Sequence, residues 1–303
     1  RIQENRYLTT MILPDSIELF LRLVLAYLLA DFTLQPDFWV KNQRKHDWRS
    51  IYFVHHALMA GGLTFIIANL WNIAFILKDP SSFPLFLPQF YNTLLYAFAL
   101  VAVAHFVIDG VKPWKRVTLR RMIKPGEESD AIEAITENPA HMHFAEIIAH
   151  LVVLLFALAQ LSPRIPVPYL PGTPGEMIRI WIIAIAFLLI LRPGGMLVSG
   201  SIRSWRRDWE NSEEVGLDHA GRLIGYVERL LIVMFILVHE YTAIGFLIAA
   251  KGLFRINDTK RSEYIIVGTL MSFAIAVLIG AITSYLVYQG GIEQVIRYCS
   301  ELL

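Results

Sequence analysis

The chain alternates between long apolar segments and short connections that are rich in charge. Segments of roughly 20 mostly apolar residues, the length with which an α-helix crosses a bilayer, occur about eight times. The seventh has about 14 residues, or roughly 21 Å of helix against a bilayer core of roughly 30 Å, so it is short or re-entrant. The pattern predicts an all-α fold, a polytopic transmembrane helical bundle with about seven to eight membrane helices. They are expected at residues 16–35, 51–77, 90–111, 144–161, 177–200, 223–238, 241–254 and 264–288.

The composition supports a membrane protein, because 55% of the 303 residues are hydrophobic and the mean hydropathy is +0.50. The net charge of +1 and the clustering of the basic residues argue against nucleic acid as a partner. The expected partners are membrane lipids and either a second copy of the chain or a larger membrane complex. The single cysteine, Cys299, excludes an internal disulfide framework and a cysteine-based zinc site.

The basic residues predict the topology. Connections that carry many of them alternate with connections that carry little beyond Lys78 and Arg164. Since cytoplasmic loops are enriched in Lys and Arg, the odd-numbered connections are expected in the cytoplasm and both termini outside. This is the arrangement of a multi-pass protein of the inner, or plasma, membrane. The basic stretches lie at residues 41–49, 112–124, 203–207 and 251–261.

A proline-rich loop at residues 163–176, PRIPVPYLPGTPGE, divides the chain. We expect an N-terminal four-helix transmembrane unit over residues 1–162 and a C-terminal transmembrane unit over residues 177–303. The connection at 112–142 turns acidic in its second half, which is typical of an amphipathic surface helix.

The C-terminal segments carry packing signals. Arg192 and Pro193, followed by two glycines, predict a kink in the helix at 177–200. Glu228, Arg229 and Lys251 suggest an ion pair that locks helix packing or, alternatively, an anion-binding group. A stripe of small residues predicts close helix contact, either within the chain or in a homodimer. Its members are Gly268, Ser272, Ala276 and Gly280.

Acidic and histidine side chains recur in the first four membrane segments, each near the end that meets a basic connection. His105 and Asp109 are four residues apart, as are Glu146 and His150, so each pair stacks on one helix face. A rise of about 1.5 Å per residue places the set roughly 5 to 15 Å inside the cytoplasmic interface, within reach of one ion. Charged groups at that depth are costly, and mixed imidazole and carboxylate ligands suit zinc, manganese or iron. The candidate metal ligands are Asp31, His55, His56, His105, Asp109, Glu146 and His150.

Two alternatives stay open within this set. Adjacent residues on a helix point about 100° apart, so only one of His55 and His56 is expected to face the bundle. Glu146 and His150 are ligands or, alternatively, the catalytic general base for a metal-bound water. The competing interpretation makes each side chain an interfacial residue that is bonded to a backbone carbonyl.

Several stretches resemble a bacterial integral membrane family catalogued as domain of unknown function 3307. The resemblance runs from about Leu21 to Gly280 and departs from the family's usual Asp-Gln at Glu146 and Ile147, which keep the acid and lose the amide. It implies a bacterial inner-membrane protein and little chemistry. The first half is also distantly similar to membrane-bound metal-dependent hydrolases with His and Asp ligands at helix ends. The stretches are LLADFTLQPDFWV, HHAL, HFVIDGVK, FAEIIAH, AGRLIGYVERLLIV, AIGFLIAAKGLFR and EYIIVGTLMSF.

Three functions fit these features. The first is a metal-dependent hydrolase of a lipid or phosphoester at the cytoplasmic leaflet, and the second is a non-catalytic scaffold or accessory subunit of a larger complex. The third is an ion or proton transporter, against which we count the almost wholly apolar outer halves of the first four helices. The chain has no nucleophile elbow, phosphate-binding glycine loop, HExxH motif or redox cysteine pair. The sequence therefore leaves open whether the protein is an enzyme.

Overall fold

The computed structural model describes residues 2–46, 49–122, 140–161, 174–201, 218–253, 262–292 and 294. Within these ranges every element is a helix and no strand occurs, which confirms the all-α fold class. Two of these helices are long and apolar enough to cross a membrane, or up to four if each of two bent helix pairs is one span. The described residues fall into two compact units, one up to Ile178 and the other from Arg179.

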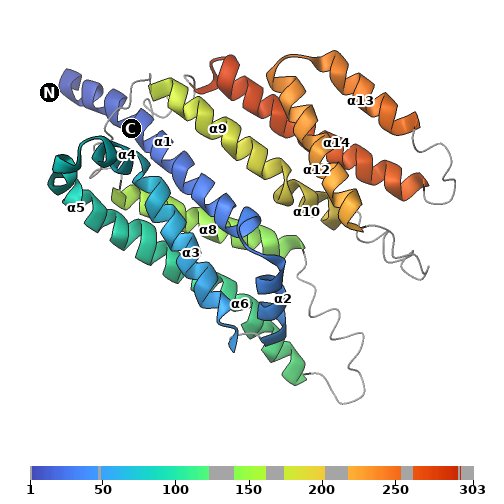
Figure 1. Cartoon of the computed structure of the whole chain (residues 1–303), viewed down its shortest axis with the longest axis horizontal. Coiled ribbons are helices and arrows are strands. Elements are labelled where there is room, and N and C mark those ends of the chain that lie inside the picture. Colours follow the sequence, from blue (N-terminus) through green and yellow to red (C-terminus); the bar gives the residue numbers. More distant parts are fainter. Residues whose placement is uncertain are drawn as a thin grey trace. The chain divides into compact units, whose positions relative to one another are not determined.

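Four helices of the first unit form a closed bundle, in which α3 contacts α1 and α6, and α8 contacts α6 and α1 (Figure 1). The apolar face of each helix is buried against its two neighbours, and the core contains Leu23, Ala60, Val101 and Leu154. The elements of this unit are α1 (Ile2–Leu28), η1 (Leu29–Thr33), α2 (Asp37–His46), α3 (Tyr52–Ala68), α4 (Leu70–Lys78), η3 (Pro80–Ser82), α5 (Phe83–Thr93), η4 (Leu94–Ala99), α6 (Leu100–Met122) and α8 (Ala140–Leu161).

Helix α3 approaches η4 and the first turn of α6 closely at Gly61. A Cβ atom at Gly61 would lie 2.6 Å from the carbonyl oxygen of Phe98 and 3.0 Å from the Cβ of Ala102. At the next residue, Gly62, a Cβ would meet nothing within 4 Å. The absence of a side chain at Gly61 therefore sets the distance between the helices that carry His56 and His105.

The helix expected over residues 51–77 is broken at Asn69, where α4 turns by 58° from α3. Buried side chains bond to the backbone at this bend. The Asn69 amide donates to the Phe65 carbonyl at 2.9 Å and to the Thr93 hydroxyl at 2.7 Å. Arg22 of α1 donates to the Ala68 carbonyl at 3.2 Å. The next span begins earlier than expected, because its apolar helical run extends over Pro80–Val111.

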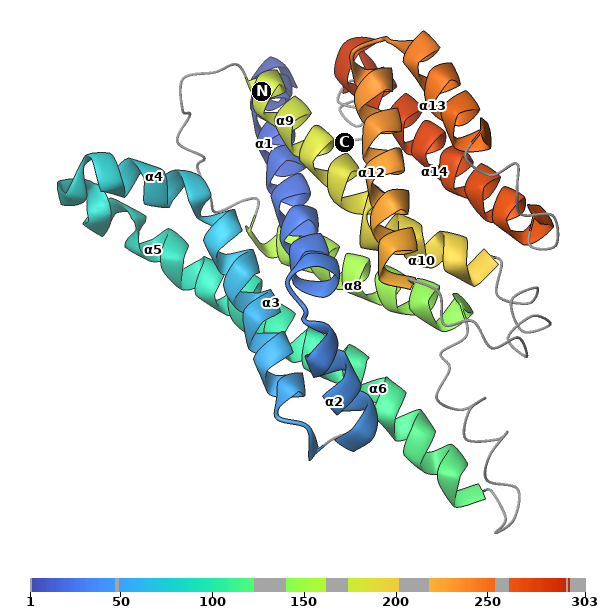
Figure 2. The same cartoon turned by 45° about the vertical axis from the view of Figure 1, so that its right-hand side comes forward.

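The second unit contains the kink that the sequence predicts, since α9 and α10 meet at 41° (Figure 2). Arg229 of α12 donates to the carbonyls of Ile190 at 2.6 Å and Leu191 at 3.3 Å, and to the Ser272 hydroxyl at 3.0 Å. A single buried guanidinium thus bonds to the backbone at the kink and ties it to α14, while the Leu191 carbonyl also accepts from the Gly195 N–H at 3.0 Å. The elements are α9 (Pro174–Ile190), α10 (Arg192–Ser201), α12 (Asp218–Leu237), α13 (Tyr241–Leu253) and α14 (Ser262–Tyr288).

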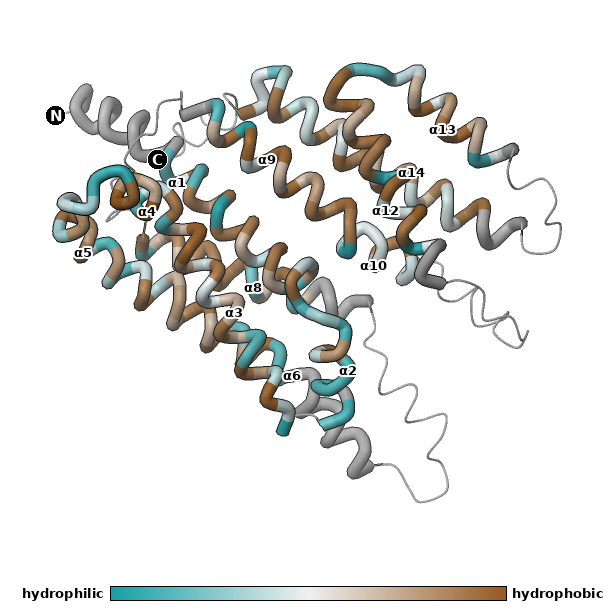
Figure 3. The backbone as a smooth tube through the Cα atoms, in the orientation of Figure 1, coloured by the Kyte–Doolittle hydropathy of each residue, from teal (hydrophilic) through white to brown (hydrophobic). Residues whose placement is uncertain are grey.

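The small-residue stripe packs inside this unit. Helix α14 lies against α12, and a Cβ at Gly280 would come within 2.7 Å of Ile236. Lys251 of α13 pairs with Glu228 of α12, so these charges fasten neighbouring helices. Figure 3 shows that α9 is mainly hydrophobic, whereas α2 is mainly hydrophilic. The expected surface helix in the acidic half of 112–142, most of the proline-rich loop and Cys299 lie outside the described residues.

Candidate metal centre

Asp31 lies in a turn of π-helix, η1, that follows α1 directly. A π-helical turn holds one residue more than an α-helical turn, so it rotates the side chains that follow it, and such turns occur frequently at functional sites. The Asp31 side chain retains 16% of its exposure and points toward the core of the first unit. The sequence placed Asp31 at the end of a membrane helix but gave no sign of this local widening.

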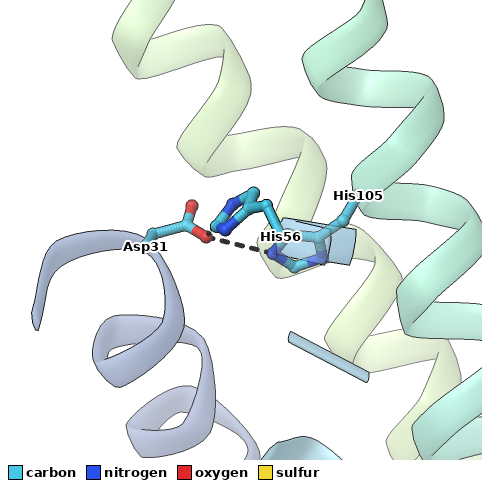
Figure 4. A group of neighbouring side chains, drawn as sticks. All are labelled: Asp31, His56 and His105. Carbon is cyan, nitrogen blue, oxygen red and sulfur yellow. Dashed lines mark hydrogen bonds and ion pairs between the residues drawn. The ribbon is translucent and has the colours of Figure 1, made fainter. Parts of the chain in front are cut away.

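Asp31, His56 and His105 converge from three helical elements, η1, α3 and α6 (Figure 4). Asp31 Oδ1 lies 3.2 Å from His105 Nε2 and 3.3 Å from His56 Nε2. One ligand atom from each residue lies within 4.8 Å of the others, which is close enough for all three to hold one metal ion. His56 and His105 retain 2% and 1% of their exposure. We call these three residues the triad.

Asp109 lies at the edge of the triad, one turn of α6 beyond His105. Its Oδ2 atom is 3.4 Å from His56 Nε2, and its side chain is 14% exposed. Ligands about 2.0–2.1 Å from a tetrahedral zinc ion lie roughly 3.3 Å from one another. The separations of 3.2 and 3.3 Å within the triad therefore match two edges of a tetrahedral site, whereas Asp109 contacts His56 and is not part of the group whose ligand atoms all lie within 4.8 Å of one another.

The backbone orients the histidine rings. His105 Nδ1 lies 3.1 Å from the Val101 carbonyl, so this nitrogen donates its proton and Nε2 is left to face Asp31. His56 Nδ1 is buried without a hydrogen-bond partner among the described residues. This pattern, with Nε2 atoms toward the centre and a carbonyl behind one ring, is that of metal-binding histidines.

His150 of α8 lies beside the triad. Its ring centroid is 4.2 Å from that of His105, and it stacks on Tyr27 at 5.1 Å. His150 Nδ1 lies 2.8 Å from the Glu146 carbonyl, and its Nε2 atom is buried with no hydrogen-bond partner in the described part of the chain. Glu146 is half-buried one turn earlier on α8. The structure thus brings His150 to the triad as an imidazole with one unused nitrogen.

His55 lies outside the triad, so the choice that the sequence left open falls on His56. The His55 side chain is exposed, and its ring lies 6.0 Å from that of Trp39 and 5.8 Å from that of Tyr52. The physical reason is the angle of about 100° between consecutive residues on α3, which directs His56 into the bundle and His55 away from it.

The negative charges of the site require positive charge nearby. Asp31 and Asp109 bring two carboxylates into a nearly buried space, and burying unpaired negative charge is costly. A divalent cation would neutralise both carboxylates, and so would protons on His56 and His105.

A second polar cluster in the first unit was missed by the sequence reasoning. Arg22 is only 1% exposed and pairs with Glu18 at 3.6 Å, while the indole of Trp71 donates to Glu18 at 2.6 Å. Together with Asn69 and Thr93, these residues correct the expectation that the halves of the helices away from the triad are almost wholly apolar. The one sequence signal was the spacing of four residues between Glu18 and Arg22 on an apolar helix.

Residues 19–169 match the model described as protein of unknown function (DUF3307). The chain carries a DUF3307 domain. The DUF3307 domain contains the triad, Asp109 and both members of the Glu146 and His150 pair. The C-terminal stretches that resemble the family lie beyond the matched residues. No curated protein and no solved structure matches the chain.

Proposed function

We propose that the protein is a membrane-embedded, metal-dependent hydrolase of a lipid or another phosphoester. The observation that carries the proposal is the convergence of Asp31, His56 and His105 from three helical elements. A buried set of two imidazoles and one carboxylate suits zinc, manganese or iron(II), with Asp109 as a fourth ligand or as a partner that orients His56.

The residues of the site would have separate roles in metal binding and proton transfer. The triad would hold the ion, which would supply Lewis acidity and lower the pKa of a bound water. His150, with its unpartnered Nε2 atom, would accept the proton of that water as general base. Glu146, the other catalytic candidate, would support α8 near the site or replace His150 in that role.

A second candidate function is a non-catalytic scaffold or accessory subunit, and the same contacts favour it. Separations of 3.2 and 3.3 Å are also those of hydrogen bonds, so Asp31 could fasten α3 and α6 without any ion. The third candidate, ion or proton transport, gains support from the polar cluster around Arg22, although about 13.5 Å of helix separates Arg22 from Asp31.

For the membrane arrangement we propose seven to eight crossings of a bacterial inner membrane, with both termini outside and the triad near the cytoplasmic leaflet. The alternation of basic connections supports this orientation. Helix α13, with 13 residues, fits the short or re-entrant seventh segment. Membrane lipids and a second copy of the chain or a larger complex remain the proposed partners.

The test is hydrolysis by the purified full-length chain after removal of metal with a chelator and reloading with zinc, manganese or iron(II). The substrates are bis(p-nitrophenyl) phosphate and phosphatidic acid in mixed micelles. We expect activity that returns only with metal and is absent in His56→Ala. His150→Gln should keep its metal but lose roughly 10²-fold in rate, whereas His239→Gln, at an exposed histidine of the second unit, should match the wild type. Metal-loaded protein that hydrolyses neither substrate would contradict the hydrolase proposal and favour the scaffold interpretation.

A further inference from the structure

Helix α2 and its neighbours combine exposed apolar and basic side chains next to the triad. Phe38 is 57% exposed, and Leu34 before the helix and Ile51 after it are 45% and 60% exposed. Lys41 and Lys45 are also exposed. At about 100° per residue, Asp37, Lys41 and Lys45 fall within one arc of roughly 80°, and Trp39 lies on the opposite side of the helix. Phe38, at about 100°, lies at the edge of that arc, so the side of α2 that faces away from Trp39 combines an exposed aromatic side chain with basic ones.

The orientation of α2 is fixed by α3. Trp39 stacks on Tyr52 with ring centroids 5.6 Å apart, and Phe38 meets the same ring edge-on at 5.4 Å. The Gln43 amide donates to the Tyr52 carbonyl at 3.0 Å, and the Ser50 hydroxyl donates to Asn42 at 2.8 Å. Because these bonds hold one face of α2 against α3, the face with Phe38 and the lysines stays outward.

The apolar side chains around α2 continue the outer face of a membrane helix. Ile51 precedes α3, and the next outward residues of that helix, Val54 and Leu58, are exposed as well. In a chain that crosses a bilayer such a face contacts lipid, and Trp and Tyr gather at the depth of the headgroups. Trp39 and Tyr52 therefore indicate that α2 lies at this depth.

The charges around α2 select the lipid. Lys41, Lys45 and Arg49 are exposed, and Asp37 is the one exposed acid among the described side chains of the helix. A basic surface at headgroup depth attracts anionic lipids. We propose that α2 lies in the plane of the membrane surface and binds the headgroups of anionic phospholipids. We call the face formed by Phe38, Lys41, Lys45 and Arg49 the lipid surface.

The opposite side of α2 adjoins α3 at His55, the neighbour of His56 in the triad. His55 contacts Trp39 and Tyr52, while His56 lies 3.3 Å from Asp31. A phospholipid held at α2 therefore lies beside the first turns of α3, the helix that carries His56 of the triad. This names the substrate class of the hydrolase as an anionic phospholipid, and this second step rests on the proposed function.

The position of α2 is tested by the depth of spin labels in the full chain. In a Cys299→Ser background, nitroxides are placed at Phe38→Cys, Ile51→Cys and Lys45→Cys, and the protein is reconstituted in nanodiscs of phosphatidylcholine and phosphatidylglycerol. We expect labels 38, 45 and 51 to be accessible to oxygen and protected from a water-soluble nickel complex, because positions 38 and 45 lie only about 20° apart around α2. Equal access of the nickel complex to all three labels, or protection of all three from both reagents by a protein partner, would overturn the inference.

The choice of lipid is tested by the phosphatidylglycerol that stays bound when the protein is purified from mixed micelles with equal amounts of phosphatidylcholine. Replacing Lys41, Lys45 and Arg49 by Gln should lower the enrichment roughly tenfold or more. Lys78→Gln, at an exposed lysine that ends α4 of the same unit, is the control and should keep it. Unchanged enrichment in the triple variant refutes anionic lipid binding here. Neither test needs a metal, so a metal-free protein that passes both loses the substrate assignment and keeps the lipid surface.

Discussion

At the scale of single residues, the sequence predicted which residue types come together but not which of the candidates do so. The four-residue spacing of polar pairs on apolar helices predicted His105, Asp109 and His150. These residues lie in or next to the triad. The choice between His55 and His56 required the rotation of α3 about its axis, which no local pattern fixes. Asp31 meets the histidines through a π-helical turn, and a single sequence gives no signal for one extra residue in a turn.

The adjacent histidines provide a matched pair of variants. His56→Ala removes a ligand atom of the triad and should abolish tight metal binding, whereas His55→Ala, at the exposed neighbour, should keep the wild-type affinity. Competition with a fluorescent zinc chelator measures both affinities under the same conditions. Equal loss in the two variants would mean that folding, and not ligation, is affected.

Asp109→Asn tests whether the fourth carboxylate belongs to the metal centre. Asp109 lies 3.4 Å from His56 Nε2, so its charge acts on the ion directly or through that ring. We expect metal affinity to fall by roughly 10- to 100-fold, the loss typical of removing a supporting partner. The same chelator competition measures it, and an unchanged affinity would remove Asp109 from the site.

At the scale of helices, hydrophobic patterning predicted where elements exist better than where they break. The kink after Ile190 was predicted because Pro193 and two glycines mark it, and it is present. The break at Asn69 was not predicted, because one asparagine in an apolar run also fits an unbroken helix. Its cause lies in Arg22 and Thr93, which are distant in the sequence and bond to the backbone and side chain at the bend.

Gly61→Ala tests the close contact between α3 and α6. The added methyl group would meet the Phe98 carbonyl at 2.6 Å, so the two helices must move apart, and His56 moves with them. We expect a lower thermal midpoint and weaker metal binding, with a cost of about 1–3 kcal/mol in stability. Gly62→Ala, where the methyl group meets nothing within 4 Å, is the control and should behave as the wild type. A variant pair with the same midpoint would show that the contact is not tight.

Arg229→Leu tests whether the hydrogen bonds of Arg229 stabilise the kink between α9 and α10. The substitution removes the guanidinium that donates to the Ile190 and Leu191 carbonyls, and hydrogen bonds to charged groups contribute roughly 1.5–3 kcal/mol each. We expect a markedly lower thermal midpoint by size-exclusion chromatography after heating. Arg222→Leu, two turns earlier at an exposed position of α12, should lie close to the wild type. Similar midpoints for both variants would contradict a structural role for Arg229.

At the scale of the whole molecule, apolar composition predicts a helical membrane protein, and the structure bears out the helices and two to four candidate spans. The number and direction of the crossings are predicted from the basic connections, and only short parts of these connections lie within the described residues. The predicted topology therefore rests on the enrichment of Lys and Arg in cytoplasmic loops. It is testable with single cysteines in a Cys299→Ser background. In right-side-out vesicles an impermeant maleimide should label Ser81→Cys and spare His46→Cys, and inverted vesicles should give the opposite result. Labelling of both from one side would refute the proposed orientation.

The central claim is that the triad holds a metal ion, and elemental analysis tests it most directly. The full chain is purified in detergent without chelators and measured by inductively coupled plasma mass spectrometry, beside monodisperse His105→Ala and Asp31→Asn variants. We predict roughly one zinc, manganese or iron per wild-type chain and its loss from both variants. A wild-type protein without metal, or the same metal content in all three proteins, would contradict the metal centre and leave Asp31, His56 and His105 as residues that fasten helices.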